Sequence, residues 1–212
     1  MEIIRLSVGV IAVNVYVYYD PVTKEGIVID PGADANRVRD KMKRAGVTVT
    51  AIAATHGHWD HIGGVMDMFQ HTGAFIYAAK AERMVLRNPA LNGSLSMASR
   101  PIALMEYTPL EEGSVIQVGG ASLRVLETPG HSCGSICLYD EANGVLFSGD
   151  TLFRESIGRT DFPTGDAEAI VASIRGKLYA LPDDVKVYPG HGPVTTIGHE
   201  KMHNPYVPQL TL

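Results

Sequence analysis

The first thirty residues alternate between apolar and other side chains, and this pattern predicts β-strands. From residue 13 to residue 18, valines at the odd positions alternate with Asn14 and tyrosines at the even positions. Turn residues follow at Asp20-Pro21, and the apolar residues 27–29 then lead into Asp30. We therefore expect a strand meander over residues 1–30, with Asp30 at the end of a buried strand.

Apolar residues at helical spacing predict helices that begin after an aspartate. Asp34 is in the N-cap position of a predicted helix over residues 35–45, which Gly46 ends. Asp166 takes the same position before a predicted helix that reaches about Leu181. In both segments the apolar side chains fall on one face, so each helix is expected to pack against a sheet.

Short apolar runs along the rest of the chain predict further strands. They cover residues 49–54, 74–77, 115–118, 122–126, 136–139, 145–147 and 185–188. Gly119-Gly120 and residues 140–144 each separate two such runs and predict hairpins. Strands are followed by helices in both halves, which favours two sheets face to face with helices outside. No linker divides the chain, so we expect one domain over residues 1–212.

Composition narrows the class of partner. Hydrophobic residues make up 45% of the 212 residues, and the formal net charge is −5 without a basic stretch. This composition argues against nucleic-acid and membrane partners and leaves a small-molecule substrate as the expectation. Cys133 and Cys137 do not form a disulfide framework, and the N-terminus lacks the pattern of a secretion signal. We therefore expect a cytoplasmic protein, and the sequence leaves its oligomeric state open.

The strongest chemical signal is a cluster of possible metal ligands on one strand-to-helix loop. His56, His58, Asp60 and His61 follow the predicted buried strand over residues 49–54. Imidazole and carboxylate ligands without a thiolate suit Zn, Fe or Mn. The alternative is a solvated histidine-rich loop, which the spacing and the flanking strand and helix disfavour.

Three further strand ends carry residues of the same types. His131, Asp150 and His191 each follow a predicted strand, and taken singly each could be an ordinary turn residue. Together with the loop cluster they make seven possible ligands, more than one four-coordinate ion uses, so two metal ions fit. Asp30 is open to two interpretations: a turn aspartate, or a carboxylate that orients a histidine ligand.

Four motifs resemble the metallo-β-lactamase superfamily. They are Thr55-His56-Gly57-His58-Trp59-Asp60-His61, Thr128-Pro129-Gly130-His131, Ser148-Gly149-Asp150-Thr151 and Pro189-Gly190-His191-Gly192. Within it the chain most resembles the short bacterial members of the glyoxalase-II-like branch, through Gly158-Arg159-Thr160-Asp161-Phe162 and Asn204-Pro205-Tyr206. The resemblance implies an α/β fold, a four-layered αββα sandwich of two mixed sheets.

The resemblance also implies how the ligands divide. His56, His58 and His131 would hold one ion, while Asp60, His61 and His191 would hold the other, with Asp150 bridging both. The expected ions are two Zn²⁺, with Fe or Mn also compatible. A metal-bridging hydroxide would attack the carbonyl of a thioester, and Asp60 would orient that hydroxide besides binding metal.

The implied substrate is S-2-hydroxyacylglutathione, such as S-lactoylglutathione, or a similar thioester. About twenty residues follow His191, too few for the helical extension that binds glutathione in full-length glyoxalase II. The main alternative is a persulfide dioxygenase on the same scaffold, with one iron held by His56, His131 and Asp150. A metal-stabilised scaffold without catalysis is a third possibility, which the complete ligand set disfavours.

Several neighbouring residues have expected roles. Residues 88–101 are a long loop that we expect to form a pocket wall and not a disordered excursion. Trp59 is expected to pack over the cluster, and Cys133 to be a buried packing thiol, not a ligand. Arg154, Arg159, Tyr107 and Lys80 are possible contacts for an anionic substrate, but ordinary surface or packing roles are favoured for each.

Overall fold

A computed structural model describes residues 1–208 and contains two six-stranded sheets. The first sheet has the order β1-β2-β3-β4-β5-β6. Its strands are β1 (Glu2–Val8), β2 (Val13–Tyr19), β3 (Glu25–Ile29), β4 (Thr48–Ala54), β5 (Phe75–Ala79) and β6 (Thr108–Leu110). Strands β1 to β3 pair antiparallel, as the predicted meander requires, and β3 to β6 pair parallel.

The second sheet has the order β14-β13-β10-β9-β8-β7. Its strands are β7 (Val115–Val118), β8 (Ala121–Glu127), β9 (Ile136–Asp140), β10 (Val145–Gly149), β13 (Lys186–Pro189) and β14 (Thr195–Thr196). Strands β7 and β8 form the hairpin predicted at Gly119-Gly120, and β9 and β10 form the second. Only β10 and β13 pair parallel in this sheet. A separate small hairpin joins β11 (Leu152–Phe153) to β12 (Ser156–Ile157).

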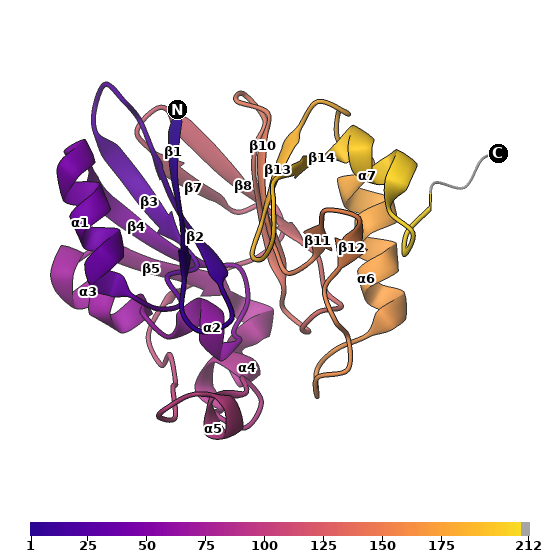
Figure 1. The fold of residues 1–212 in the computed structure, drawn as a ribbon, viewed down its shortest axis with the longest axis horizontal. Coiled ribbons are helices and arrows are strands. Elements are labelled where there is room, and N and C mark those ends of the chain that lie inside the picture. Colours follow the sequence, from indigo (N-terminus) through magenta and orange to yellow (C-terminus); the bar gives the residue numbers. More distant parts are fainter. Residues whose placement is uncertain (209–212) are drawn as a thin grey trace.

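The structure has four layers, which are helices, two sheets and helices, and a hydrophobic core lies between each pair of neighbouring layers (Figure 1). The first core joins the first sheet to α1 (Ala35–Ala45) and α3 (Val65–Thr72). The second lies between the sheets and includes Tyr16 and Phe147, and the third joins the second sheet to α6 (Ala167–Ser173) and α7 (Ile197–His203). The αββα sandwich expected from the sequence is therefore confirmed. Among residues 1–208, no helix is both long and apolar enough to cross a membrane.

Three short helices lie in connections between strands of the first sheet, one between β4 and β5 and two between β5 and β6. They are α2 (Trp59–Ile62), α4 (Arg83–Arg87) and α5 (Ser94–Met97). A 3₁₀ turn, Lys80–Glu82, leads directly into α4. The predicted helix after Asp166 also changes character, because a π-helical segment, Ile174–Leu178, follows α6.

The two predicted aspartate caps have different outcomes. Asp166 caps α6, and its Oδ1 accepts hydrogen bonds from Glu168 N and Ala169 N, both at 2.9 Å. Asp34 makes no cap hydrogen bond to α1, so that prediction was wrong. Its backbone is left-handed, with φ 52°, and its carboxylate instead pairs with Arg37 at 2.9 Å.

Replacing Asp166 by alanine should lower the free energy of unfolding by about 1 kcal/mol, because two N–H groups at the start of α6 lose their acceptor. Asp34→Asn is the matched control: it removes the charge of an exposed ion pair, keeps a residue that tolerates the left-handed backbone, and should cost less than about 0.5 kcal/mol. Urea unfolding of both variants tests this difference. Equal losses would mean that the cap bonds at Asp166 do not stabilise the helix.

Candidate metal centre

All seven predicted ligands gather at one edge of the sandwich, beyond the carboxyl ends of four strands. His56, His58, Asp60 and His61 follow β4, while His131 follows β8, Asp150 follows β10 and His191 follows β13. Six of the seven are buried, and His191 is the most accessible, with 25% of its side chain exposed. Parallel pairing within each sheet places these strand ends at the same rim, which explains how residues so distant in sequence meet.

The first implied set, His56, His58 and His131, is assembled. Their ligand atoms lie within 4.8 Å of one another, and His58 Nδ1 is 2.8 Å from His131 Nε2. His131 Nδ1 donates to the backbone carbonyl of Arg159 at 2.7 Å. In a neutral ring this fixes the proton on Nδ1 and leaves Nε2 with a free lone pair, the form in which imidazole binds a metal.

The second implied set, Asp60, His61 and His191, is assembled in the same way, with ligand atoms within 4.8 Å of one another. Asp60 Oδ2 lies 3.1 Å from His191 Nε2 and 3.3 Å from His61 Nε2. Asp60 and His61 are in the single turn of α2, and the His61 ring also lies beside that of His56, with ring centroids 4.1 Å apart. The loop therefore supplies ligands to both sets.

Asp150 lies between the two sets. Its Oδ1 is 3.4 Å from His61 Nε2, and its Oδ2 is 3.5 Å from His131 Nε2 and 3.7 Å from His191 Nε2. One oxygen or the other thus approaches a histidine of each set. This is the position that a bridging ligand needs.

Buried nitrogen and oxygen atoms that have no hydrogen-bond partner indicate that these residues fit two divalent cations. His56 Nε2, His58 Nε2 and Asp150 Oδ1 are buried and have no hydrogen-bond partner. Buried polar atoms without partners are rare and costly in native proteins, unless an ion or water satisfies them. Six nitrogen or carboxylate ligands in two sets, with a seventh between them, suit ions such as Zn²⁺ or Fe²⁺.

Electrostatics distinguish the two sets. Burial lowers the pKa of His58 to about 3 and holds the pKa of His56 well below its usual range, so both rings are neutral. Burial alone would lower the pKa of His61, but the nearby carboxylates of Asp150 and Asp60 raise it well above its usual value. For Asp60, burial acts to raise the pKa, and His61 and His191 outweigh it, so the carboxylate stays ionised.

Asp30 makes the contact that an orienting role requires. Its Oδ2 lies 3.0 Å from His61 Nδ1 and accepts a hydrogen bond from Thr55 Oγ1 at 2.7 Å, while its Oδ1 accepts from Thr55 N at 2.7 Å. The residue is buried and left-handed, with φ 51°. A strained backbone beside a ligand is typical of functional sites, so Asp30 does more than form a turn.

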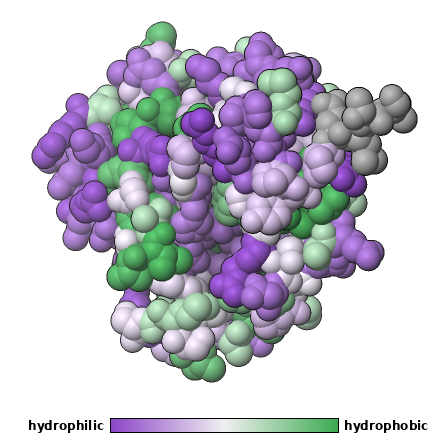
Figure 2. Space-filling view, turned by 45° about the vertical axis from the view of Figure 1, so that its right-hand side comes forward, coloured by the Kyte–Doolittle hydropathy of each residue, from purple (hydrophilic) through white to green (hydrophobic). Residues whose placement is uncertain are grey.

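A cavity of about 610 Å³ opens onto the cluster. Besides ligands, its lining is mainly apolar and comes from several segments: Val10, Ile11, Trp59, Asn92, Met97, Phe153, Ser156, Ile157, Arg159 and Phe162. Asn92 and Met97 belong to the loop expected to form a wall, and α5 gives that loop a helical turn. The face drawn in Figure 2 is mostly hydrophilic with separate hydrophobic patches, so the apolar lining differs from the typical surface there.

Of the four possible contacts for an anionic substrate that the sequence offered, Arg159 is the one that lines this cavity. Its guanidinium pairs with Asp161 at 2.6 Å and lies 4.3 Å from the centre of the Phe162 ring. Lys80 pairs with Glu111 at 2.6 Å, Arg154 approaches Glu155 at 3.8 Å, and Tyr107 packs against the first core. These three have the surface and packing roles that were favoured.

Cys133 differs from its expected place. It lies in the turn before β9 and not in the strand, and it is exposed instead of buried. Its Sγ is 3.6 Å from Ala81 O, and the thiol does not belong to either ligand set. Its spacing from Cys137 matched a strand, but Cys133 and Gly134 form a turn, and β9 begins only at Ile136.

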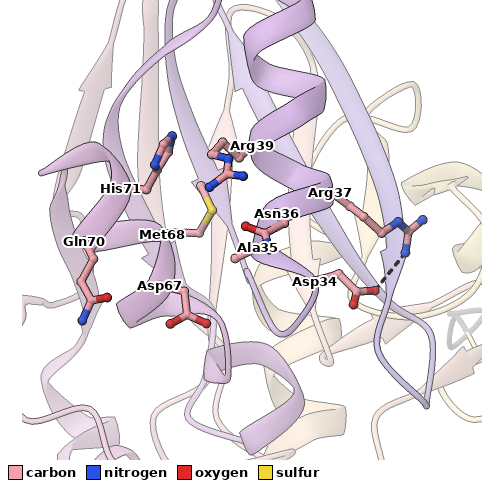
Figure 3. A pocket seen from close by; sticks show the side chains of 9 residues that line it. All are labelled: Asp34, Ala35, Asn36, Arg37, Arg39, Asp67, Met68, Gln70 and His71. Carbon is pink, nitrogen blue, oxygen red and sulfur yellow. Dashed lines mark hydrogen bonds and ion pairs between the residues drawn. The ribbon is translucent and has the colours of Figure 1, made fainter.

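Another hollow, about 480 Å³ in volume, lies between α1 and α3 on the outer face of the first sheet (Figure 3). Charged and polar side chains dominate it, including the Asp34–Arg37 pair and His71. His71 is in the last turn of α3, a position where the helix dipole favours basic side chains. It therefore stands apart from the metal cluster.

Comparison with known proteins agrees with this geometry. Residues 8–191 match the family model of the metallo-beta-lactamase superfamily. The hydroxyacylglutathione hydrolase GloC of Haemophilus influenzae is 36% identical over 186 residues, which cover 87% of this chain and 88% of that protein.

Two crystal structures share the fold over almost their whole length. The BLEG-1 B3 metallo-beta-lactamase has a TM-score of 0.91 and 41% identity, with 97% of this chain and 99% of that chain covered. TTHA1623 in a di-iron-bound form has a TM-score of 0.86 and 32% identity, with 96% and 99% covered. The matched residues include three of the four motifs in full, the fourth as far as His191, and every member of both ligand sets, and the chain belongs to the metallo-beta-lactamase superfamily.

Proposed function

We propose that this protein is a two-metal hydrolase of thioesters and that S-2-hydroxyacylglutathione represents its substrate class. The observation that carries the proposal is the pair of three-residue ligand sets with Asp150 between them. The similarity to GloC supports the substrate class, and the similarity to a di-iron-bound structure supports two ions in such a site. Zn²⁺ and iron both suit the donors.

Two bound divalent ions would lower the pKa of a water molecule to about 7 and polarise a carbonyl oxygen. The protein's own groups would position the reactants around them. Asp60 remains ionised beside His61 and His191, so its carboxylate can accept a hydrogen bond from the attacking water and orient it. The apolar walls of the cavity would exclude bulk water and strengthen these interactions.

The lining of the cavity favours a thioester over an amide. Among the described residues that line it, none is a lysine or a tyrosine that could protonate a departing amine. A thiolate leaves without a proton, whereas the nitrogen of a hydrolysed amide needs one. The similarity to a metallo-beta-lactamase makes β-lactam hydrolysis the second candidate function, and its amide bond is the less suited to this lining.

A direct comparison of the two substrates tests the proposal. The purified protein should hydrolyse S-lactoylglutathione with a kcat/KM at least about 100-fold above that for a chromogenic cephalosporin, the difference of about 3 kcal/mol that leaving-group protonation can supply. Both reactions should be followed with the same metal-loaded sample. A higher kcat/KM for the cephalosporin would replace the proposed function by the second candidate.

The thiol carrier should matter little. Glutathione carries two carboxylates, but Arg159 is the one cationic side chain among the described residues that line the cavity, and Asp161 already neutralises it. S-lactoyl-N-acetylcysteamine, which lacks those carboxylates, should be hydrolysed with a kcat/KM within about tenfold of that for S-lactoylglutathione, because exposed ion pairs contribute little. A much larger preference for glutathione would show that a charged subsite lies outside this cavity.

A further inference from the structure

Glu82 is a fully buried carboxylate directly beneath the predicted metal centre. It ends the 3₁₀ turn Lys80–Glu82 and is 0% exposed. It does not belong to either ligand set, and the neighbouring Lys80 and Arg83 are exposed. A buried carboxylate is costly unless hydrogen bonds satisfy both oxygens, so the partners of Glu82 indicate its role.

Each oxygen of Glu82 binds a different ligand-bearing loop. Oε1 accepts a hydrogen bond from Gly57 N at 2.9 Å, and Oε2 accepts one from Gly134 N at 2.7 Å. Gly57 lies between His56 and His58, and Gly134 follows His131 by three residues. The carboxylate therefore connects the backbones of the two loops whose histidines make up the first set.

The two glycines are needed for this close approach. A Cβ on Gly57 would lie 2.9 Å from Val85 Cγ1 and 3.1 Å from Leu86 N. A Cβ on Gly134 would overlap the backbone of Ala81 and Glu82. Both loops thus rest directly on the segment from Ala81 to Leu86, and a side chain at either glycine would lift its loop away from that support.

We infer that Glu82 is a positioning residue for the first set: by holding Gly57 N and Gly134 N at once, it sets the separation of His58 from His131. The distance that Glu82 fixes is the 2.8 Å between His58 Nδ1 and His131 Nε2. This inference depends on the proposed metal centre but not on the substrate. Groups that orient metal ligands from behind commonly change metal affinity about 10- to 100-fold when they are replaced.

Glu82→Gln is the most direct test, because it keeps the size of the side chain. An amide has one acceptor oxygen, and its NH₂ group would face the other backbone N–H, so one loop loses its partner. We expect one of the two metal equivalents to bind about 10- to 100-fold more weakly, in a Zn²⁺ competition titration against a chromophoric chelator. The absorption spectrum of the Co²⁺-substituted protein should change as well, since the geometry of the first set changes.

Glu200→Gln is the matched control. Glu200 is also 0% exposed, and its Oε2 accepts from Glu155 N at 2.8 Å and from Asn204 Nδ2 at 2.9 Å. It is in α7 and contacts neither ligand-bearing loop. We expect this variant to lose thermal stability to a similar extent as Glu82→Gln while both metal equivalents keep their affinity.

Several outcomes would overturn the inference. Unchanged Zn²⁺ affinity and Co²⁺ spectrum in Glu82→Gln would make Glu82 a purely structural residue, as would equal losses of affinity in both variants. If Glu82→Gln does not fold, Glu82→Asp replaces it, because the shorter side chain keeps the charge but cannot reach both loops; unchanged affinity there would equally contradict the inference. Metal binding is measured without substrate, so failure of thioester hydrolysis would leave this result unaffected.

Discussion

Replacing Asp150 by alanine is expected to remove at least one metal equivalent and to lower kcat/KM by about 1000-fold, which is the scale of losing a principal electrostatic element of an active site. Asp150 approaches His61 at 3.4 Å through Oδ1 and His131 at 3.5 Å through Oδ2, so both sets lose the same neighbour. Metal analysis by mass spectrometry, beside the S-lactoylglutathione assay, measures both effects.

Asp34→Ala provides the control, because this exposed aspartate lies next to α1 and pairs only with groups outside the cluster. It should retain two metal equivalents and parental activity. An Asp150→Ala protein that keeps two equivalents and full activity would show that the carboxylate does not bridge the sets. Circular dichroism of both variants would confirm that any loss of metal occurs in a folded chain.

Removing the metals altogether should abolish hydrolysis and destabilise the fold. Without cations, His56 Nε2 and His58 Nε2 are buried without partners. Ions at about 1000 times their dissociation constant stabilise the native state by about 4 kcal/mol per site, so removing both should lower the Tm by roughly 15 to 30 °C. Activity should return on titration with Zn²⁺ and should stop rising at two equivalents per chain.

The same titration distinguishes the persulfide dioxygenase that the sequence left open. That enzyme would need one iron, held by His56, His131 and Asp150, and would produce sulfite from glutathione persulfide. Such an enzyme would retain Asp60, His61 and His191 without using them to hold its iron, whereas their ligand atoms here lie within 4.8 Å of one another, as a second ion would require. A single iron per chain together with sulfite production would overturn the hydrolase proposal.

The sequence predicts the fold and the candidate ligands for the same physical reason. A buried strand demands apolar side chains, so a histidine or aspartate close behind its end stands out, as Asp150 does directly after β10 and His131 does in the turn after β8. Strand ends at one rim of a sheet then have to meet. The division of the ligands into two sets came from the family resemblance, because strand ends alone do not determine which side chains lie closest.

The residues that were missed depend on long-range contacts. Glu82 lies among Lys80, Arg83 and Arg87, a context typical of a solvated helix, and its burial becomes visible only when Gly57 and Gly134 pack on it. Asp34 has the right residue type and place for a cap, but its left-handed backbone turns the carboxylate away from the N–H groups of α1.

Apart from Trp59, the walls of the cavity come from different parts of the chain than the predicted ligands. The ligands follow the ends of central strands, whereas Ile11, Met97 and Phe162 are in connecting segments that do not belong to either six-stranded sheet. Substitutions or insertions in those segments can therefore reshape the cavity while the cluster keeps its geometry. Such a division makes the protein a favourable starting point for directed evolution, with libraries restricted to the walls and the reactive centre left intact.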